Sequence, residues 1–329
     1  MKLELSTQQL KEGILQGSRT ILSKAITLVE SSNTNHQQQA HQLIDSIISY
    51  SGNSVRIGIT GVPGVGKSTF IESVGLFAIN QGKKVAVLAI DPSSQRNKGS
   101  ILGDKTRMEE LAKHKNAFIR PSPSSGYLGG IAASTYESVL LCEAAGYDFI
   151  LIETVGVGQS ETMVADLSDV FLFLTVSNTG DELQGIKRGI MEMADLIFIN
   201  KVDNPTERSV IDAKADLVRA LQLIPHQNKN WKTPVILGSA IKNEGIDVLW
   251  KYLNDFISTQ KTDTLFEERR KQQRKKRFET LLNYFIKQYI IQSTQGKEWY
   301  QKLLQSIENE EISSHSASEK MLTEWKKIN

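Results

Sequence analysis

The sequence contains few residues that could hold a metal ion or crosslink the chain. Among its 329 residues there is one cysteine, Cys142, and there are five histidines. A single cysteine excludes an intramolecular disulfide and a thiolate metal cage, and it is typical of a reducing compartment. His36 and His41 lie five positions apart, which is a poor spacing for two ligands of one ion. We therefore interpret these two histidines as polar surface.

Net charge and long apolar runs are also scarce. The formal net charge is +2 at pH 7, which argues against a dedicated nucleic-acid-binding protein. No apolar run approaches the roughly 18–20 residues that a membrane-spanning helix needs. The first residues lack the apolar core of a secretory signal and include acidic residues, which transit peptides usually lack. We expect a soluble, cytoplasmic protein that binds neither nucleic acid nor a membrane.

A glycine-rich motif is the strongest feature that the sequence does contain. It follows residues 55–60, which predict a buried strand, and precedes a helix predicted over 70–81. The glycines let backbone N–H groups approach a triphosphate closely, and a lysine within the motif can reach the β- and γ-phosphates. A glycine-rich turn before a helix is the alternative, but strand, loop and helix stand in the order that nucleotide binding requires. The motif consists of Gly61, Val62, Pro63, Gly64, Val65, Gly66, Lys67, Ser68 and Thr69.

The rest of the chain predicts an α/β fold, the three-layer sandwich of P-loop NTPases with a mostly parallel sheet. Strands are predicted at 55–60, 84–90, 148–153, 170–176, 196–200 and 235–238. Ligands bind at the carboxyl ends of the strands in such sheets. Four polar residues fall there, namely Asp91, Glu153, Asn200 and Ser239.

Helical patterns flank this central region on both sides. We predict a helical N-terminal extension over 1–50, a nucleotide-binding domain over 51–260 and a helical C-terminal arm over 261–329. In the extension, Ser6 and Gln9 predict a capping box, and the polar stretch 31–39 is expected to separate two helices.

The predicted arm contains a basic run from Arg269 to Arg277. We interpret this run as a solvated helix face, and contact with nucleic acid or an acidic partner is the alternative. An apolar stripe at helical spacing follows the basic run. This apolar face must be buried somewhere, and we predict that a second copy of the chain covers it in a homodimer. Packing inside the chain is the alternative. The stripe consists of Phe278, Leu281, Leu282, Phe285 and Tyr289.

A second motif, Asn200-Lys201-Val202-Asp203, follows a predicted apolar strand and points to guanine. The Asp203 carboxylate would accept from N1–H and the 2-amino group, and adenine offers neither donor. Asn200 would tie the base loop to the phosphate loop, and the Lys201 stem would cover the base. Ser239, Ala240 and Ile241 fit the loop whose backbone contacts guanine O6. The predicted cofactors are therefore GTP or GDP, together with Mg²⁺.

The metal end of the predicted site departs from the common Asp-x-x-Gly pattern. Glu153 stands at its first position and could bind Mg²⁺ directly or through water, while the Gly156 N–H could sense the γ-phosphate. Ser68 is a candidate magnesium ligand through its hydroxyl. Asp91 and Asp104 are further candidates, with an ordinary turn or an exposed loop as the alternatives.

The group that positions the attacking water is less defined. Val157 directly follows Gly156, so Gln159 could act only with a loop path different from that of Ras-type enzymes. Lys67 and Lys187 could supply positive charge in catalysis, although Lys187 could equally face solvent. We therefore expect slow intrinsic GTP hydrolysis that a partner or loop ordering accelerates.

Five segments together resemble one family, the MeaB/ArgK-type G proteins, chaperones of adenosylcobalamin-dependent methylmalonyl-CoA mutase. The similarity runs from about residue 50 to 260, and the third segment is far more diagnostic than the phosphate loop, because most GTPases carry aspartate at its first position. Lys98 stands where a second glycine would be expected before Gly99. The segments are Gly61–Thr69, Gly99–Met108, Glu153–Glu161, Gly180–Lys187 and Asn200–Asp203.

The resemblance implies a homodimeric GTPase that binds an adenosylcobalamin-dependent acyl-CoA mutase. Such a protein would gate cofactor loading and protect or reactivate the mutase. The resemblance also implies that Gly180–Lys187 is a mobile segment linking nucleotide state to the partner. It assigns phosphate and Mg²⁺ roles to Lys67, Ser68, Asp91, Asp104 and Glu153.

Three other functions are weighed against this one. A metallochaperone GTPase would need a His/Cys cluster, and one cysteine with five scattered histidines does not provide it. An ATP-dependent kinase linked to basic amino-acid transport disagrees with the motif Asn200–Asp203. A scaffold that binds GTP without hydrolysing it is the third alternative.

Overall fold

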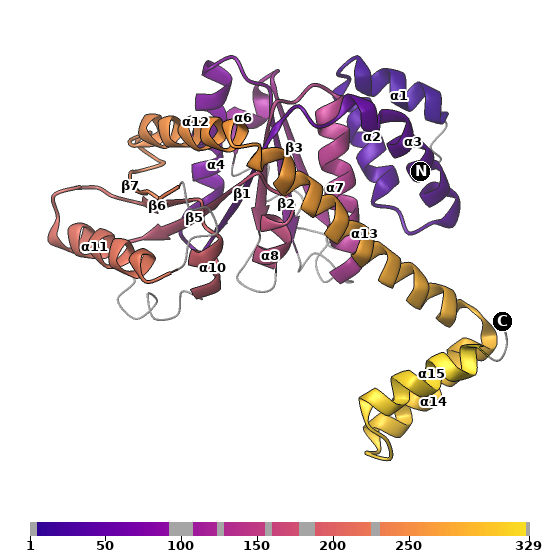
Figure 1. Ribbon diagram of the computed structural model, residues 1–329. Helices are drawn as coiled ribbons and strands as arrows, with labels where there is room; N and C mark the ends of the chain where they lie inside the picture. Colours follow the sequence, from indigo (N-terminus) through magenta and orange to yellow (C-terminus); the bar gives the residue numbers. More distant parts are fainter. Residues whose placement is uncertain are drawn as a thin grey trace. The chain divides into compact units, whose positions relative to one another are not determined.

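The computed structural model describes residues 5–91, 108–123, 128–154, 160–177, 188–224 and 231–326. The chain divides into two compact units, which we call unit 1 (residues 1–271) and unit 2 (residues 272–329). Unit 1 holds the sheet and the N-terminal helices, and unit 2 is helical (Figure 1).

Unit 1 begins with three helices, α1 (Thr7–Leu15), α2 (Arg19–Val29) and α3 (Thr34–Ile47), and a short 3₁₀ helix, η1 (Ile48–Tyr50). The predicted capping box is present, because Ser6 accepts from the Gln9 N–H and the Gln9 side chain accepts from the Ser6 N–H. The prediction of a break over 31–39 is wrong for residues 34–39. Asn33 caps α3 by accepting from two backbone N–H groups, and this starts the helix inside the polar stretch.

The sheet contains seven parallel strands in the part of the chain that the structure describes, in the order β3-β2-β4-β1-β5-β6-β7. All six predicted strands are present, and the prediction of a parallel sheet is confirmed. The strands are β1 (Val55–Gly61), β2 (Val85–Asp91), β3 (Ala117–Pro123), β4 (Phe149–Thr154), β5 (Val170–Val176), β6 (Leu196–Asn200) and β7 (Val235–Leu237).

Strand β3 was not predicted, and its sequence explains why. It contains Pro121 and Pro123, which have no backbone N–H to donate to a neighbouring strand. Prolines are tolerated in an edge strand, and β3 is the edge strand of this sheet beside β2. An edge position is a property of the folded sheet, so the local sequence pattern does not reveal it.

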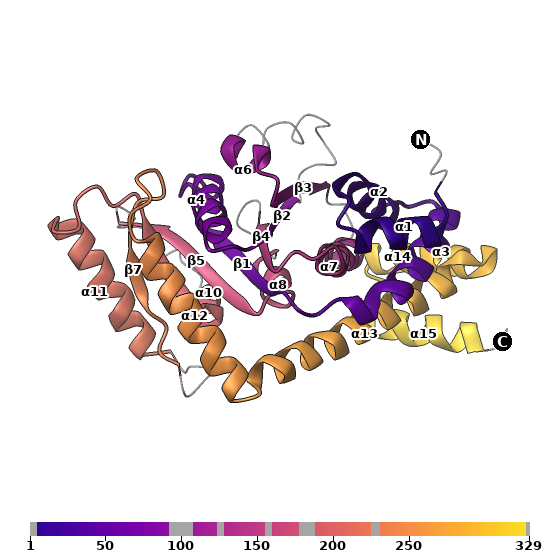
Figure 2. The same cartoon turned by 90° about the horizontal axis from the view of Figure 1, so that it is seen from above.

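Helices cover both faces of the sheet, which confirms the predicted three-layer sandwich (Figure 2). Alternate strand residues point to opposite faces, so Val85 and Val87 join one apolar cluster while Ala86 and Leu88 join the other. One face packs against α4 (Lys67–Asn80), α6 (Glu109–Lys113) and α12 (Ile246–Thr262). The other face packs against α7 (Leu128–Ala144), α8 (Ser160–Ala165), α10 (Arg188–Met193) and α11 (Arg208–Gln222).

Three aspartates hold the amino-terminal edge of the sheet in register. Each one directly precedes a strand and accepts a backbone N–H from a neighbouring strand or from the residue that leads into it. Asp148 accepts from Lys84 N at 2.5 Å, Asp169 from Arg56 N at 2.8 Å and Asp195 from Phe171 N at 2.8 Å. These side chains satisfy backbone donors at the point where the ladder of inter-strand bonds begins.

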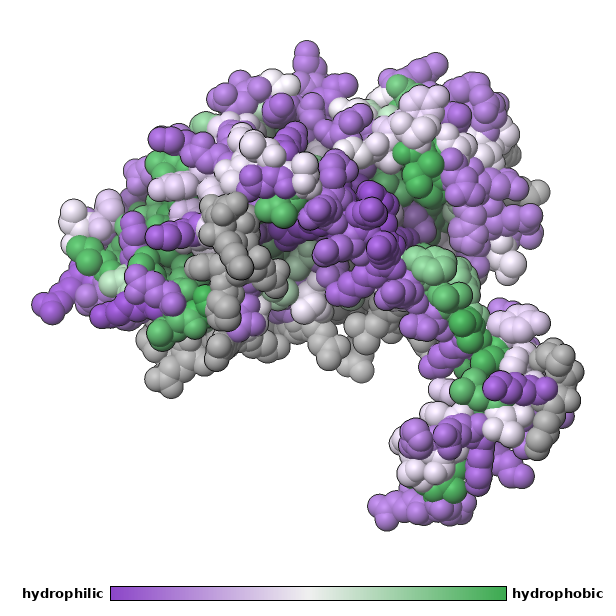
Figure 3. All heavy atoms as spheres, viewed as in Figure 1, coloured by the Kyte–Doolittle hydropathy of each residue, from purple (hydrophilic) through white to green (hydrophobic). Residues whose placement is uncertain are grey.

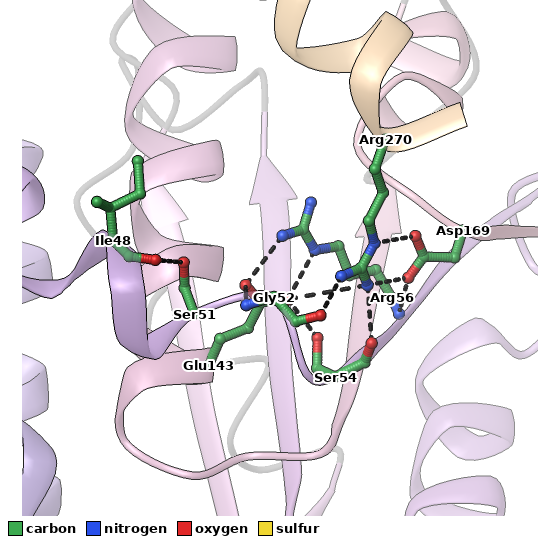
Figure 4. Close-up of polar contacts among 8 residues, drawn as sticks. All are labelled: Ile48, Ser51, Gly52, Ser54, Arg56, Glu143, Asp169 and Arg270. Atoms are coloured by element: carbon green, nitrogen blue, oxygen red, sulfur yellow. Dashed lines mark hydrogen bonds and ion pairs between the residues drawn. The ribbon is translucent and has the colours of Figure 1, made fainter. Parts of the chain in front are cut away.

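Helix α13 (Leu265–Gln292) starts in unit 1 and is anchored there by a buried cluster of charges. The cluster consists of Arg56, Glu143, Asp169 and Arg270, and we call it the arginine–carboxylate cluster (Figure 4). Each of the four residues is at most 6% exposed. Arg270 is 3% exposed, so the prediction of a solvated basic run is wrong at this position.

Unit 2 contains the remainder of α13 together with α14 (Thr294–Glu308) and α15 (Ser314–Lys326). Apolar side chains gather along α13, and Phe278, Phe285 and Tyr289 are each more than half exposed (Figure 3). A groove of about 340 Å³ lies between the three helices, lined by residues that include Ile286, Ile290 and Leu304. Among the helices that the structure describes, none has the length and apolar character to cross a bilayer.

Candidate nucleotide-binding site

The glycine-rich loop connects the central strand β1 to the start of α4. Gly64 and Gly66 have φ of +79° and +90°, a backbone conformation that favours glycine. Lys67 is the first residue of α4, and its Nζ donates to Gly61 O at 2.7 Å and to Val62 O at 3.4 Å. Its ammonium group therefore lies against the inner side of the loop. A helix start of this kind attracts anions because its N–H groups have no partner within the helix.

Two glycines of this loop are also required by close neighbours. A Cβ on Gly61 would lie 2.3 Å from Leu174 O of the adjacent strand β5. A Cβ on Gly66 would lie 3.1 Å from the Asn200 side-chain amide. The second contact shows that the two motifs found in the sequence pack directly against each other.

Asn200 and Lys201 join the phosphate loop to the end of β6. The Asn200 amide donates to Val65 O at 2.8 Å, and its Oδ1 accepts from the Ala240 N–H at 2.9 Å. The Lys201 Nζ donates to Gly64 O at 2.7 Å. Asn200 is 2% exposed, so its two bonds are buried, whereas Lys201 lies at the surface. Three loops that are far apart in sequence are thereby held as one surface.

Asp203 presents its carboxylate at the outer end of this surface. Its side chain is 81% exposed and forms an ion pair of 2.9 Å with Lys242. Ile241 lies in the same loop as Lys242 and is also 81% exposed, which is high for an isoleucine. Lys242 was not among the predicted residues. The signal that could have found it is its place directly after the predicted base-contacting residues 239–241.

The predicted metal end brings a carboxylate and a hydroxyl to the same edge of the sheet. Glu153 lies in β4 next to β1 and is 5% exposed, and Ser68 is half-buried in the first turn of α4. Burial lowers the pKa of Lys67, and the charges of Glu153 and Glu161 oppose this shift. Glu153 and Glu161 are thus close enough to Lys67 to act on its charge. Carboxylate and hydroxyl oxygens are ligands that suit Mg²⁺.

Several predicted site residues lie outside the described part of the chain. They are Asp104, Gly156, Gln159 and Lys187. Asp91 ends β2, but its side chain is also outside the description. Within the residues that are described, no group of three or more histidines, cysteines, aspartates and glutamates could hold a metal ion.

The chain is similar to known proteins over most of its length. Residues 22–295 match a family described as "Methylmalonyl Co-A mutase-associated GTPase MeaB". GTPase ArgK of Escherichia coli is 45% identical over 303 residues, 91% of this chain and 90% of the relative. The mouse protein "Methylmalonic aciduria type A homolog, mitochondrial" is 46% identical over 258 residues, 75% of this chain and 62% of the relative.

A solved structure has a similar fold over almost the whole chain. The crystal structure of a "LAO/AO transport system kinase" superposes with a TM-score of 0.79 and 35% identity, covering 99% of both chains. The family match covers well over half of the chain and includes both nucleotide motifs. The chain therefore belongs to the MeaB family of methylmalonyl-CoA mutase-associated GTPases, and it is itself a GTPase that binds guanine nucleotides.

Proposed function

We propose that GTP, GDP and Mg²⁺ bind on the surface formed by residues 61–69, Asn200–Asp203 and Ser239–Ile241. Lys67 would neutralise the phosphates, the Asp203 carboxylate would accept from the base, and the backbone of the loop Ser239–Ile241 would face O6. Ser68 and Glu153 would hold the metal ion directly or through water, with Asp91 and Asp104 as further oxygen donors. The metal would supply charge neutralisation at the phosphates.

We further propose that the nucleotide state controls association with an adenosylcobalamin-dependent acyl-CoA mutase of the methylmalonyl-CoA mutase type. The protein would gate loading of the cofactor and protect or reactivate the mutase in the cytoplasm. The observation that carries this proposal is the match of residues 22–295 to a family described by its association with that mutase. The segments predicted to sense the γ-phosphate and to contact the partner are Glu153–Glu161 and Gly180–Lys187.

We also propose that the chain acts as a homodimer through unit 2. The stripe on α13 supports this, because Phe278, Phe285 and Tyr289 are 65%, 51% and 65% exposed. Covering aromatic side chains of this size by a second copy would remove a large apolar area from water.

Association with the mutase is tested by mixing the purified protein with methylmalonyl-CoA mutase of the same organism. Binding is measured with a non-hydrolysable GTP analogue, with GDP and without nucleotide. We expect a complex whose dissociation constant differs by about 5- to 150-fold between the GTP-analogue and GDP states, the usual range for coupled sites.

The variants Lys67→Ala and Lys113→Met separate a nucleotide effect from a charge effect. Lys67→Ala should lose the dependence on nucleotide, whereas Lys113→Met should retain it. Lys113 is exposed and pairs with Glu110 on α6, and it belongs to neither nucleotide motif. Absence of a complex in every nucleotide state, with an active mutase, would refute the proposed function.

A further inference from the structure

The loop between β7 and α12 reaches two neighbours through consecutive side chains. We define the base loop as Ser239–Glu244. Its neck is closed by two backbone bonds, Ser239 N to Glu244 O at 3.1 Å and Glu244 N to Ser239 O at 3.0 Å. Lys242 and Asn243 extend from this closed loop to different elements. The loop is thus a compact body whose position depends on a small number of contacts.

Asn243 connects the base loop to the phosphate-loop helix. Its φ is +56°, a left-handed conformation that asparagine tolerates better than most residues. The hydroxyl of Ser73, in the second turn of α4, donates to Asn243 Oδ1 at 2.5 Å. Ser73 is 5% exposed, so this contact is shielded at one end. The backbone segment that carries the Ala240 N–H is thereby fixed relative to α4.

Lys242 connects the base loop to the base-reading motif. Its Nζ lies 2.9 Å from Asp203 Oδ1, with the two side chains 41% and 81% exposed. The hydrogen bond to Asp203 raises the pKa of Lys242, so the pair favours the charged form of this lysine. An aspartate this exposed would otherwise sample several rotamers, and binding a base would have to order it. The lysine limits that freedom before the base arrives.

We propose that Lys242 and Asn243 are positioning residues for guanine recognition, which goes beyond the motif residues and rests on the proposed guanine site. Lys242 acts through Asp203 and therefore on recognition of N1–H and the 2-amino group. Asn243, held by Ser73, acts through the Ala240 segment and therefore on recognition of O6. The two residues tie the base loop to two different elements, α4 and the motif Asn200–Asp203.

The experiment is a set of equilibrium titrations with GDP, IDP and ADP on five variants and the wild type. IDP keeps O6 and N1–H but lacks the 2-amino group, and ADP lacks all three guanine features. Lys242→Met should weaken GDP binding by about two- to five-fold, the range for an exposed ion pair. It should weaken IDP binding less and leave ADP binding unchanged. Asn243→Gly keeps the positive φ. It should weaken binding of GDP and of IDP equally, by about five-fold, and leave ADP binding unchanged.

Three further variants exclude general effects. Ser73→Ala should reproduce Asn243→Gly, and the double variant should lose no more than either single one, because both remove the same contact. Lys113→Met removes an exposed lysine pair of the same 2.9 Å length on α6 and should change none of the three affinities.

The outcomes separate this inference from the proposed site. If the wild type binds GDP and ADP equally, the guanine site itself is wrong. If the wild type prefers GDP and the variants keep its GDP-to-ADP and GDP-to-IDP ratios, only the positioning roles are wrong. Equal weakening of all three nucleotides, with a lower thermal midpoint of the nucleotide-free variants, would show a merely structural brace and would overturn the inference.

Discussion

Replacing Asp203 with asparagine is expected to weaken GDP binding by about 100- to 1,000-fold and to shift preference toward xanthosine diphosphate. The aspartate carboxylate only accepts hydrogen bonds, which matches the two donors of guanine. The asparagine amide instead points one donor group at the guanine 2-amino group. Xanthine carries a carbonyl oxygen at that position and accepts from the amide.

The structure makes this substitution a clean test of recognition. Asp203 is 81% exposed, so an asparagine of almost the same size should leave the fold unchanged. Titrations with GDP, XDP and ADP measure the change on wild type and Asp203→Asn. Asp212→Asn, at another exposed aspartate of an ion pair on α11, is the matched control and should bind GDP as the wild type does. Unchanged GDP affinity in Asp203→Asn would remove this residue from the site.

Replacing Arg270 with methionine is expected to lower the free energy of unfolding of unit 1 by about 3–5 kcal/mol. The Arg270 guanidinium donates to both oxygens of Asp169, at 2.7 and 2.6 Å, and to the carbonyls of Gly52 and Ser54 (Figure 4). Methionine offers no donor, so buried Asp169 would lose both guanidinium bonds and keep only the Arg56 backbone N–H and the nearby charge of the Arg56 side chain. An uncompensated buried charge is the reason for the large effect.

Arg269 and Arg274 supply graded controls for this prediction. Arg269 makes a single bond of 3.1 Å to Asp195, and its side chain is 30% exposed, so Arg269→Met should cost about 1 kcal/mol. Arg274 is exposed on the same helix, and its substitution should cost less than about 0.5 kcal/mol.

Unfolding in denaturant is monitored by hydrogen exchange of the backbone amides in β1 and β5. These strands report on unit 1 separately from unit 2. We expect the loss in the free energy of unfolding to be largest for Arg270→Met, smaller for Arg269→Met and smallest for Arg274→Met. If Arg270→Met unfolds at the same denaturant concentration as Arg274→Met, the arginine–carboxylate cluster does not stabilise unit 1.

The sheet and both nucleotide motifs could be predicted because their signals are local. Each buried parallel strand appears as a short apolar run, and a polar residue marks its carboxyl end. The exception, β3, carries prolines that its edge position permits. The start of α3 was misplaced because Asn33 acts as a helix cap, whereas the polar residues around it suggested a loop.

The contacts that were not predicted join residues far apart in the chain. Arg270 looked like one member of a solvated basic run, yet its partner Asp169 lies 101 positions away. Ser73 and Asn243 are 170 positions apart, and neither belongs to a known nucleotide motif. Such pairs depend on how strands are ordered in the sheet. A sequence pattern along one helix or strand carries no information about that order.

The most direct test of the central claim is single-turnover GTP hydrolysis, measured with and without the adenosylcobalamin-dependent mutase. We expect a slow reaction for the protein alone, because Val157 occupies the position where Ras-type enzymes carry glutamine. Saturating mutase should raise the rate by about ten-fold or more, within the range of a well-placed catalytic group. A fast reaction that the mutase leaves unchanged would contradict a nucleotide switch that serves this partner.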